Sequence, residues 1–133
     1  NVGFAYIQLN ELDSALAYTW ETYRLAKEQK DDYILGFACR NFGEISDRNE
    51  TYNQSLIHYN EGLEIAERSH NNYLKASLLY RIGDVYNRML KPALAIQALN
   101  QAITISKKSG YKAEYEKALL YIADSYSLSG NFK

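Results

Sequence analysis

The stretch LLYRIGDVYNRMLKPALAIQALNQAITIS, residues 78–106, decides the fold. Its apolar residues recur every three to four positions on both sides of Leu90-Lys91-Pro92, which predicts two amphipathic helices joined by a tight turn. Pro92 suits the first turn of the second helix, because the N–H that proline lacks would have no partner there. We therefore expect a helical hairpin.

The same pattern recurs along the chain with a period of 40 residues. A small residue occupies one slot of every first helix: Gly3, Gly43, Gly83 and Ala123. Another small residue recurs near the start of every second helix: Ala15, Ser55 and Ala95. Glycine inside a helix costs about 1 kcal/mol relative to alanine, so its recurrence in one frame predicts close contact between paired helices. A fixed period of this length is typical of helical repeats that pack only against their neighbours.

The spacing resembles the tetratricopeptide repeat. The resemblance is carried by Ile82, Gly83, Tyr86, Pro92, Ala95, Leu99 and Ala102. The usual unit has about 34 residues, so this chain resembles the longer variant; HEAT and armadillo units have similar periods but lack this Gly-x-x-Tyr…Ala spacing. Ser46, Thr19 and Thr22 depart from the family pattern. The resemblance implies an all-α, right-handed solenoid of antiparallel helix-turn-helix repeats.

We expect one domain over residues 1–133. The expected repeats are 1–30 (truncated), 33–69, 73–109 and the first helix of a fourth, 112–133. The expected helices are 1–9, 12–28, 33–48, 52–68, 73–89, 92–108 and 112–128, followed by a turn at 129–131 with Phe132 in the turn slot. Asp31 and Asp32 can cap a helix start, and Gly110 a helix end. Because Asn1 falls inside a helical pattern, we expect a fragment of a longer protein.

Composition argues against several classes of partner. Fifteen basic residues face 16 acidic ones, so we expect no nucleic-acid partner. No apolar run approaches the ~20 residues of a membrane span, and we expect no membrane contact. Cys39 alone excludes an internal disulfide; it shares a slot with Leu79 and Leu119, which predicts a core position. We expect a cytoplasmic location, with a periplasmic sensor segment as the alternative.

No catalytic pattern is present in the sequence. Neither His58 nor His70 has a second ligand four residues further along, and no Gly-rich phosphate loop or nucleophile–base pattern occurs. We expect no enzyme activity, no cofactor and no metal site. For Trp20 the alternatives are an exposed anchor and packing against a neighbouring helix, and we favour packing.

The resemblance implies that the first helices of the repeats line a concave groove, with exposed slots on both sides of the small residue. The residues predicted to bind a partner there are Arg40, Asn41, Glu44, Arg48, Tyr80, Arg81, Asp84, Asn87, Arg88, Tyr121 and Asp124. Polar and aromatic groups in one groove can bind a peptide. The alternative is a self-neutralised surface, since Glu44–Arg48 and Asp84–Arg88 have the spacing of helix ion pairs.

One ligand mode of the family can be compared residue by residue. Asn41 and Arg81 match two positions of its carboxylate clamp, but Phe4 and Ser77 replace two others. We therefore do not expect that clamp. Arg81 is the residue on which we expect binding to depend most, with Asp84 one turn away as a competing internal partner.

The expected function is a non-catalytic protein–protein interaction module that binds a peptide or partner domain. Repeats of this length resemble those of bacterial regulators, which implies the sensory or regulatory part of a larger signalling protein. The alternative is a self-associating spacer that dimerises a longer protein, and the exposed end repeats predict a homo-oligomer. The apolar residues that predict self-association are Leu119, Ile122, Ala123 and Tyr126.

Overall fold

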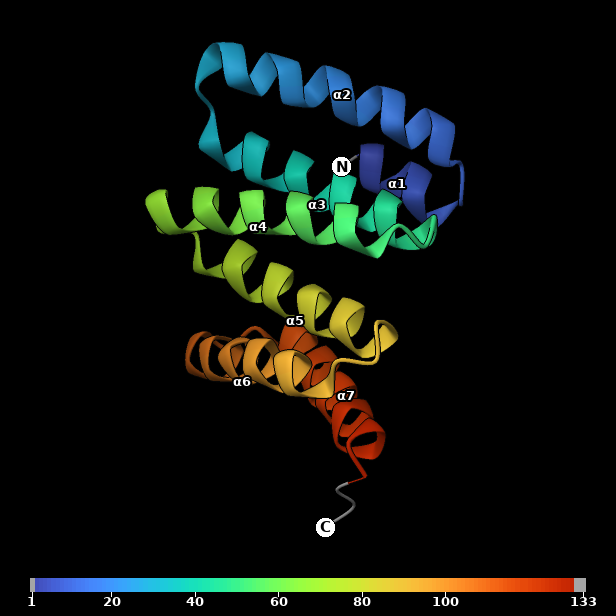
Figure 1. Cartoon of the computed structure of the whole chain (residues 1–133). Coiled ribbons are helices and arrows are strands. Elements are labelled where there is room, and N and C mark those ends of the chain that lie inside the picture. Colours follow the sequence, from blue (N-terminus) through green and yellow to red (C-terminus); the bar gives the residue numbers. More distant parts are fainter. Residues whose placement is uncertain (1, 131–133) are drawn as a thin grey trace. The chain divides into compact units, whose positions relative to one another are not determined.

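In the computed structural model, which describes residues 2–130, the chain forms seven helices and no strand (Figure 1). The helices are α1 (Val2–Gln8), α2 (Leu12–Gln29), α3 (Asp32–Arg48), α4 (Tyr52–Arg68), α5 (Asn72–Arg88), α6 (Pro92–Ser109) and α7 (Lys112–Leu128). Their bounds agree with the predicted ones to within one residue at each end. The all-α class of helical repeats is confirmed. The predicted turn at Asn131 and the slot of Phe132 lie outside the described residues.

Contacts between Cα atoms divide the chain into two compact units, residues 1–71 and 72–133. In the first unit, α2 packs against α1 and α3, and α3 packs against α4. In the second unit, α5, α6 and α7 pack against one another. The organisation of residues 1–133 as one domain with four repeats stays a prediction.

Small residues bring the paired helices together, as the repeat predicts. A Cβ atom on Gly43 would lie 2.3 Å from Cε1 of Tyr59, and one on Gly83 would lie 2.4 Å from Cγ of Leu99. Ser55 donates a hydrogen bond of 2.8 Å to the Gly43 carbonyl. Positions 43 and 83 therefore require glycine, because even a methyl group there would overlap a buried side chain of the partner helix.

Part of the core of the first unit lies where α2, α3 and α4 meet. One cluster contains Ala26, Leu35, Cys39 and Ile65. Cys39 is fully buried, which confirms its predicted core position, and burial raises the pKa of its thiol. A buried thiol of this kind is protonated and chemically inert.

A residue in the left-handed conformation follows each helix by one or two positions, and these residues are spaced by 20 positions. They are Asn10, Lys30, Glu50, His70, Leu90, Gly110 and Gly130. The N–H after the left-handed residue closes each of the first six turns, as in the 2.9 Å bond from Lys91 N–H to the Tyr86 carbonyl. The 40-residue repeat thus consists of two equal halves. Sequence predicted this conformation only at Gly110.

The helix starts follow the predicted signals. The Asp31 carboxylate caps α3 by accepting a 3.1 Å hydrogen bond from Ile34 N–H, and Pro92 begins α6.

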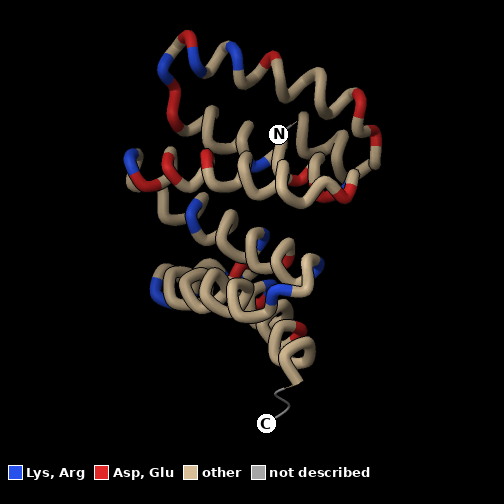
Figure 2. The backbone as a smooth tube through the Cα atoms, viewed as in Figure 1, with Lys and Arg blue, Asp and Glu red and all other residues tan. Residues whose placement is uncertain are grey.

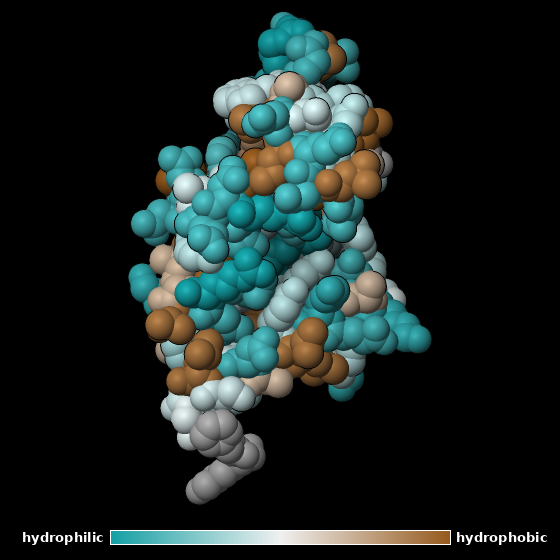
Figure 3. Space-filling model, turned by 90° about the vertical axis from the view of Figure 1, so that its right-hand side faces the viewer, coloured by the Kyte–Doolittle hydropathy of each residue, from teal (hydrophilic) through white to brown (hydrophobic). Residues whose placement is uncertain are grey.

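On the face shown in Figure 3, hydrophobic residues lie in small separate groups among hydrophilic ones. No helix within residues 2–130 is long and apolar enough to cross a membrane.

Candidate functional site

In the second unit, α5 and α7 bring together most of the predicted binding residues of that unit. The rings of Tyr80 and Tyr121 stack with their centroids 6.1 Å apart. The guanidinium carbon of Arg81 lies 4.7 Å from the centroid of the Tyr80 ring. Arg81 Nη1 also donates hydrogen bonds to the hydroxyl and the carbonyl of Ser77. The buried Tyr80 ring therefore supports two half-buried groups, the Tyr121 ring and the Arg81 guanidinium, which form one polar, aromatic surface.

Two acidic residues, Asp84 on α5 and Asp124 on α7, lie on the helices that form this surface. Asp84 lies 3.2 Å from Arg88 on the same helix, in the predicted i,i+4 pair. Burial, together with the negative charge of Asp84, raises the pKa of Tyr121 to about 12. The Tyr121 phenol therefore stays protonated near neutral pH and can donate a hydrogen bond. Asp124 is exposed one turn further along α7.

Asn87 has a structural role in this unit. It is buried, its Nδ2 donates a 2.9 Å hydrogen bond to the Tyr121 carbonyl, and its Oδ1 accepts a 2.7 Å bond from Ser125 Oγ. The prediction of an exposed slot is wrong for Asn87, because its amide joins α5 to α7.

In the first unit, the predicted residues lie on α3. Arg40 and Asn41 are buried, so their predicted exposure is also wrong. The Arg40 guanidinium lies over the rings of Phe4 and Phe37, at 5.4 and 4.7 Å from their centroids, and these rings cover it. Asn41 packs beside Gly3, since a Cβ on Gly3 would lie 3.1 Å from Asn41 Nδ2.

Three predicted residues of α3 and α5 remain to be placed: Glu44, Arg48 and Tyr80. Glu44 and Arg48 approach within 3.8 Å on α3, in the predicted pair. Tyr80 is 9 % exposed, which corrects its prediction as an open slot. A binding role stays a prediction both for the predicted residues of α3 and for those of α5 and α7.

A sequence model of the tetratricopeptide repeat matches residues 36–108, more than half of the chain. The chain belongs to the tetratricopeptide repeat family. Tetratricopeptide repeats form a non-catalytic fold and generally mediate protein–protein interaction. No curated protein matches the sequence.

The structure shows a second group of side chains that the family pattern does not demand. Trp20, Tyr23 and Phe42 form an aromatic cluster in the first unit, and His58 contacts Phe42 with 5.1 Å between ring centroids. Trp20 packs on a neighbouring helix, as predicted, and is also 57 % exposed; a role as a binding anchor stays a prediction.

A signal for this cluster exists in the repeat frame. Asn60 and Asn100 occupy the slot of Trp20 in the next two tetratricopeptide repeats. An aromatic side chain where other copies carry a polar one departs from the packing pattern. The other histidine, His70, is the exposed left-handed residue two positions after the end of α4. No group of three or more potential metal ligands lies among residues 2–130.

Proposed function

We propose that this chain binds a peptide or a partner domain through its first-helix residues, with the α5–α7 surface as the best-supported part. The observation that carries the proposal is the group formed by Tyr80, Tyr121 and Arg81, with Asp84 and Arg88 beside it. Tyr121 and Arg81 are the half-buried members of this group, held in place by the buried Tyr80 ring, and tyrosine and arginine are enriched among residues that dominate binding energy.

The chemistry of the group favours an extended or helical peptide. Arg81 can present a planar fork of donors to a carboxylate or to peptide carbonyls. Tyr121 supplies a protonated hydroxyl, and Asp84 and Asp124 can accept hydrogen bonds from peptide N–H groups or basic side chains. Donors and acceptors lie on one helix pair, so a peptide backbone can be satisfied along its length.

The proposal includes a regulatory role within a larger bacterial signalling protein. Its support is the resemblance of the 40-residue repeats to those of bacterial regulators. The membership of residues 36–108 in a protein-interaction family agrees with such a role.

Site-specific photo-crosslinking tests the surface. A photo-reactive phenylalanine at Leu120, which is exposed next to Tyr121 on α7, should capture the partner in cells of the source organism. The matched control places the same group at Leu94, which is exposed on α6 of the same unit. Capture from Leu120 and not from Leu94 supports the proposal. Equal capture, or capture from Leu94 alone, contradicts it.

Self-association is the second candidate, and a difference in exposure favours it. Leu119 on α7 is 42 % exposed, whereas Cys39 and Leu79 in the same slot are 0 % and 4 % exposed. An exposed apolar helix face is a usual site of protein contact. Sedimentation velocity should show a concentration-dependent shift that Leu119→Gln reduces. A monomer at all concentrations would exclude this candidate.

A further inference from the structure

Trp20 is the single tryptophan of the chain, and its position is unusual for a packing residue. Its ring contacts Phe42 of α3 at 5.0 Å between centroids, yet the residue is 57 % exposed. Asn60 and Asn100 hold this slot in the other repeats, so the packing of α2 in a repeat does not require an indole there. Exposed tryptophan in a fixed position is a typical centre of a binding surface.

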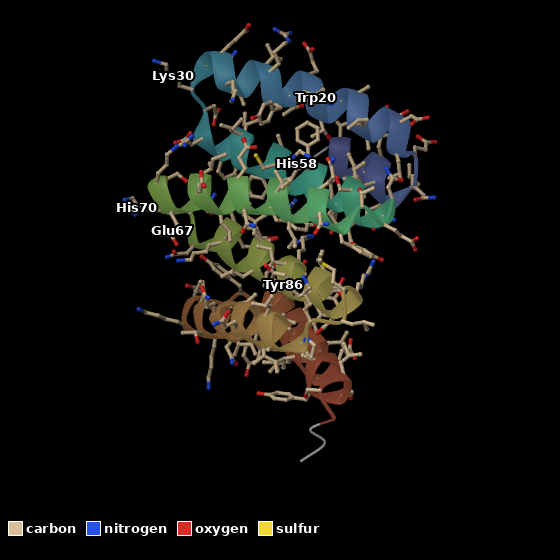
Figure 4. All side chains as sticks on the ribbon, in the orientation of Figure 1. Trp20, Lys30, His58, Glu67, His70 and Tyr86 are labelled. Atoms are coloured by element: carbon tan, nitrogen blue, oxygen red, sulfur yellow. The ribbon has the colours of Figure 1, made fainter. Side chains whose placement is uncertain are left out.

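The surroundings hold the indole in place. Trp20, Tyr23 and Phe42 contact one another edge to face, with all centroid distances between 5.0 and 5.9 Å. The Tyr23 hydroxyl donates a 2.7 Å hydrogen bond to Glu61, which joins α2 to α4. Figure 4 shows Trp20 of α2 and His58 of α4 directed toward the same region. A ligand that binds the outer indole face would therefore order few side chains.

Helices α2 and α4, which carry Trp20, Tyr23 and His58, are acidic. Their charged residues are Asp13, Glu21, Glu28, Glu61, Glu64 and Glu67 against Arg24, Lys27 and Arg68 (Figure 2). Arg24 is already held by Glu21 and Glu28 at 2.7 and 3.2 Å, and Arg68 is held by Asp32 at 2.7 Å. The second helix of the next repeat, α6, carries two lysines and no acid. The negative charge is therefore a feature of α2 and α4.

The aromatic cluster already contacts one cation, the Lys27 ammonium. Lys27 Nζ lies 5.2 Å from the centroid of the Tyr23 ring. Tryptophan binds cations more strongly than tyrosine through its ring face. Glu61 receives its hydrogen bond from the neutral Tyr23 hydroxyl, so this contact does not cancel its charge.

We propose that the exposed face of Trp20, with Glu61 joined to it through Tyr23, binds a lysine or arginine side chain of a protein partner. An indole face and a neighbouring carboxylate are the two groups that favour an organic cation. This surface consists of second-helix residues of the first unit and does not rest on the function proposed for the α5–α7 surface.

Titration with a charged peptide and its neutral counterpart tests the proposal. The probe is an acetylated, amidated tetra-arginine peptide at low salt, and the counterpart has four citrullines, which keep the planar head group without the charge. Binding is followed by the nuclear magnetic resonance signal of the Trp20 indole N–H and by the fluorescence of this single tryptophan. We expect a saturable change with the arginine peptide that the citrulline peptide does not produce.

Two variants locate the binding. Trp20→Asn, which copies the other repeats, should weaken the arginine peptide about 3- to 30-fold, the fold-change that corresponds to a cation–π contact. Its affinity is followed by backbone amide signals, because this variant lacks the indole. Tyr33→Asn removes another exposed aromatic ring of the first unit and should leave the affinity unchanged.

Three results would overturn the proposal. Equal binding of the citrulline peptide would make the site a neutral stacking surface. Equal affinity of Trp20→Asn and the parent protein would place the peptide elsewhere. A concentration-dependent indole signal without peptide would show that a second copy of the chain occupies the surface.

Discussion

Replacing Gly83 by alanine should destabilise the protein, although alanine is the better helix former. Gly83 lies inside α5, and its position faces Leu99 of α6. Helix propensity alone predicts a gain of about 1 kcal/mol from this change. Close packing predicts the opposite sign, so the experiment separates the two effects.

The structure sets the magnitude. The new Cβ would lie 2.4 Å from Cγ and 2.6 Å from Cδ2 of Leu99, which is fully buried. Carbon atoms prefer separations of about 3.5–4.0 Å, so α5 and α6 must move apart by about 1 Å or Leu99 must leave its rotamer. Overpacking costs about 1–3 kcal/mol, and we expect the upper end because the overlap includes the branching carbon. After the gain in propensity, a net loss of about 2 kcal/mol remains.

Urea unfolding followed by far-ultraviolet circular dichroism measures the difference. Ala123→Gly is the matched control, because Ala123 holds the same slot on an exposed part of α7; it should lose about 1 kcal/mol from propensity alone. Leu99→Ala combined with Gly83→Ala should cost less than the sum of the single changes, because the methyl group then fills part of the cavity.

A Gly83→Ala protein as stable as the parent, or more stable, would refute this reasoning. That result would mean that α5 and α6 have space for the methyl group, contrary to the close contact between position 83 and Leu99. Additive free energies in the double variant would show in addition that the two positions do not touch.

Three further changes test local features. Leu90→Gly should stabilise the protein by about 1 kcal/mol and Gly110→Ala should destabilise it by a similar amount, because both positions are left-handed; thermal melts check both. Asp31→Ala should cost about 1 kcal/mol in urea unfolding, because the cap on Ile34 N–H is lost, whereas Asp31→Asn should cost little. Burial lowers the pKa of His58, so the folded state favours the neutral ring, and stability should decrease as the pH falls through the unfolded value near 6.5. His58→Phe should reduce that decrease, and an unchanged pH profile would contradict the assignment.

The helices and their close contacts could be predicted from the sequence because both follow a periodic pattern of residue types. Gly43 and Gly83 recur in one frame, and the structure places a buried side chain against each. Most of the left-handed residues after the helices could not be predicted from the sequence, because residue types such as Leu90 and Glu50 do not favour that conformation. Their 20-residue spacing emerges only from the backbone angles.

The candidate site was less predictable than the fold. The repeat frame places Arg40 and Asn87 on exposed slots, but burial depends on neighbours that the frame does not include. The rings of Phe4 and Phe37 cover Arg40, and α7 engages the amide of Asn87. For Trp20, packing and exposure looked like alternatives, whereas a large indole does both.

Titration calorimetry on the partner captured at Leu120 tests the central claim most directly. Arg81→Ala should weaken binding by about 1–3 kcal/mol, the range for a hydrogen bond to a charged group, and Arg81→Lys should fall between this variant and the parent because it keeps the charge without the fork. Arg24→Ala, which removes an exposed arginine of α2, should bind like the parent. Equal affinity of Arg81→Ala and the parent protein, with both folded, would contradict binding through the α5–α7 surface.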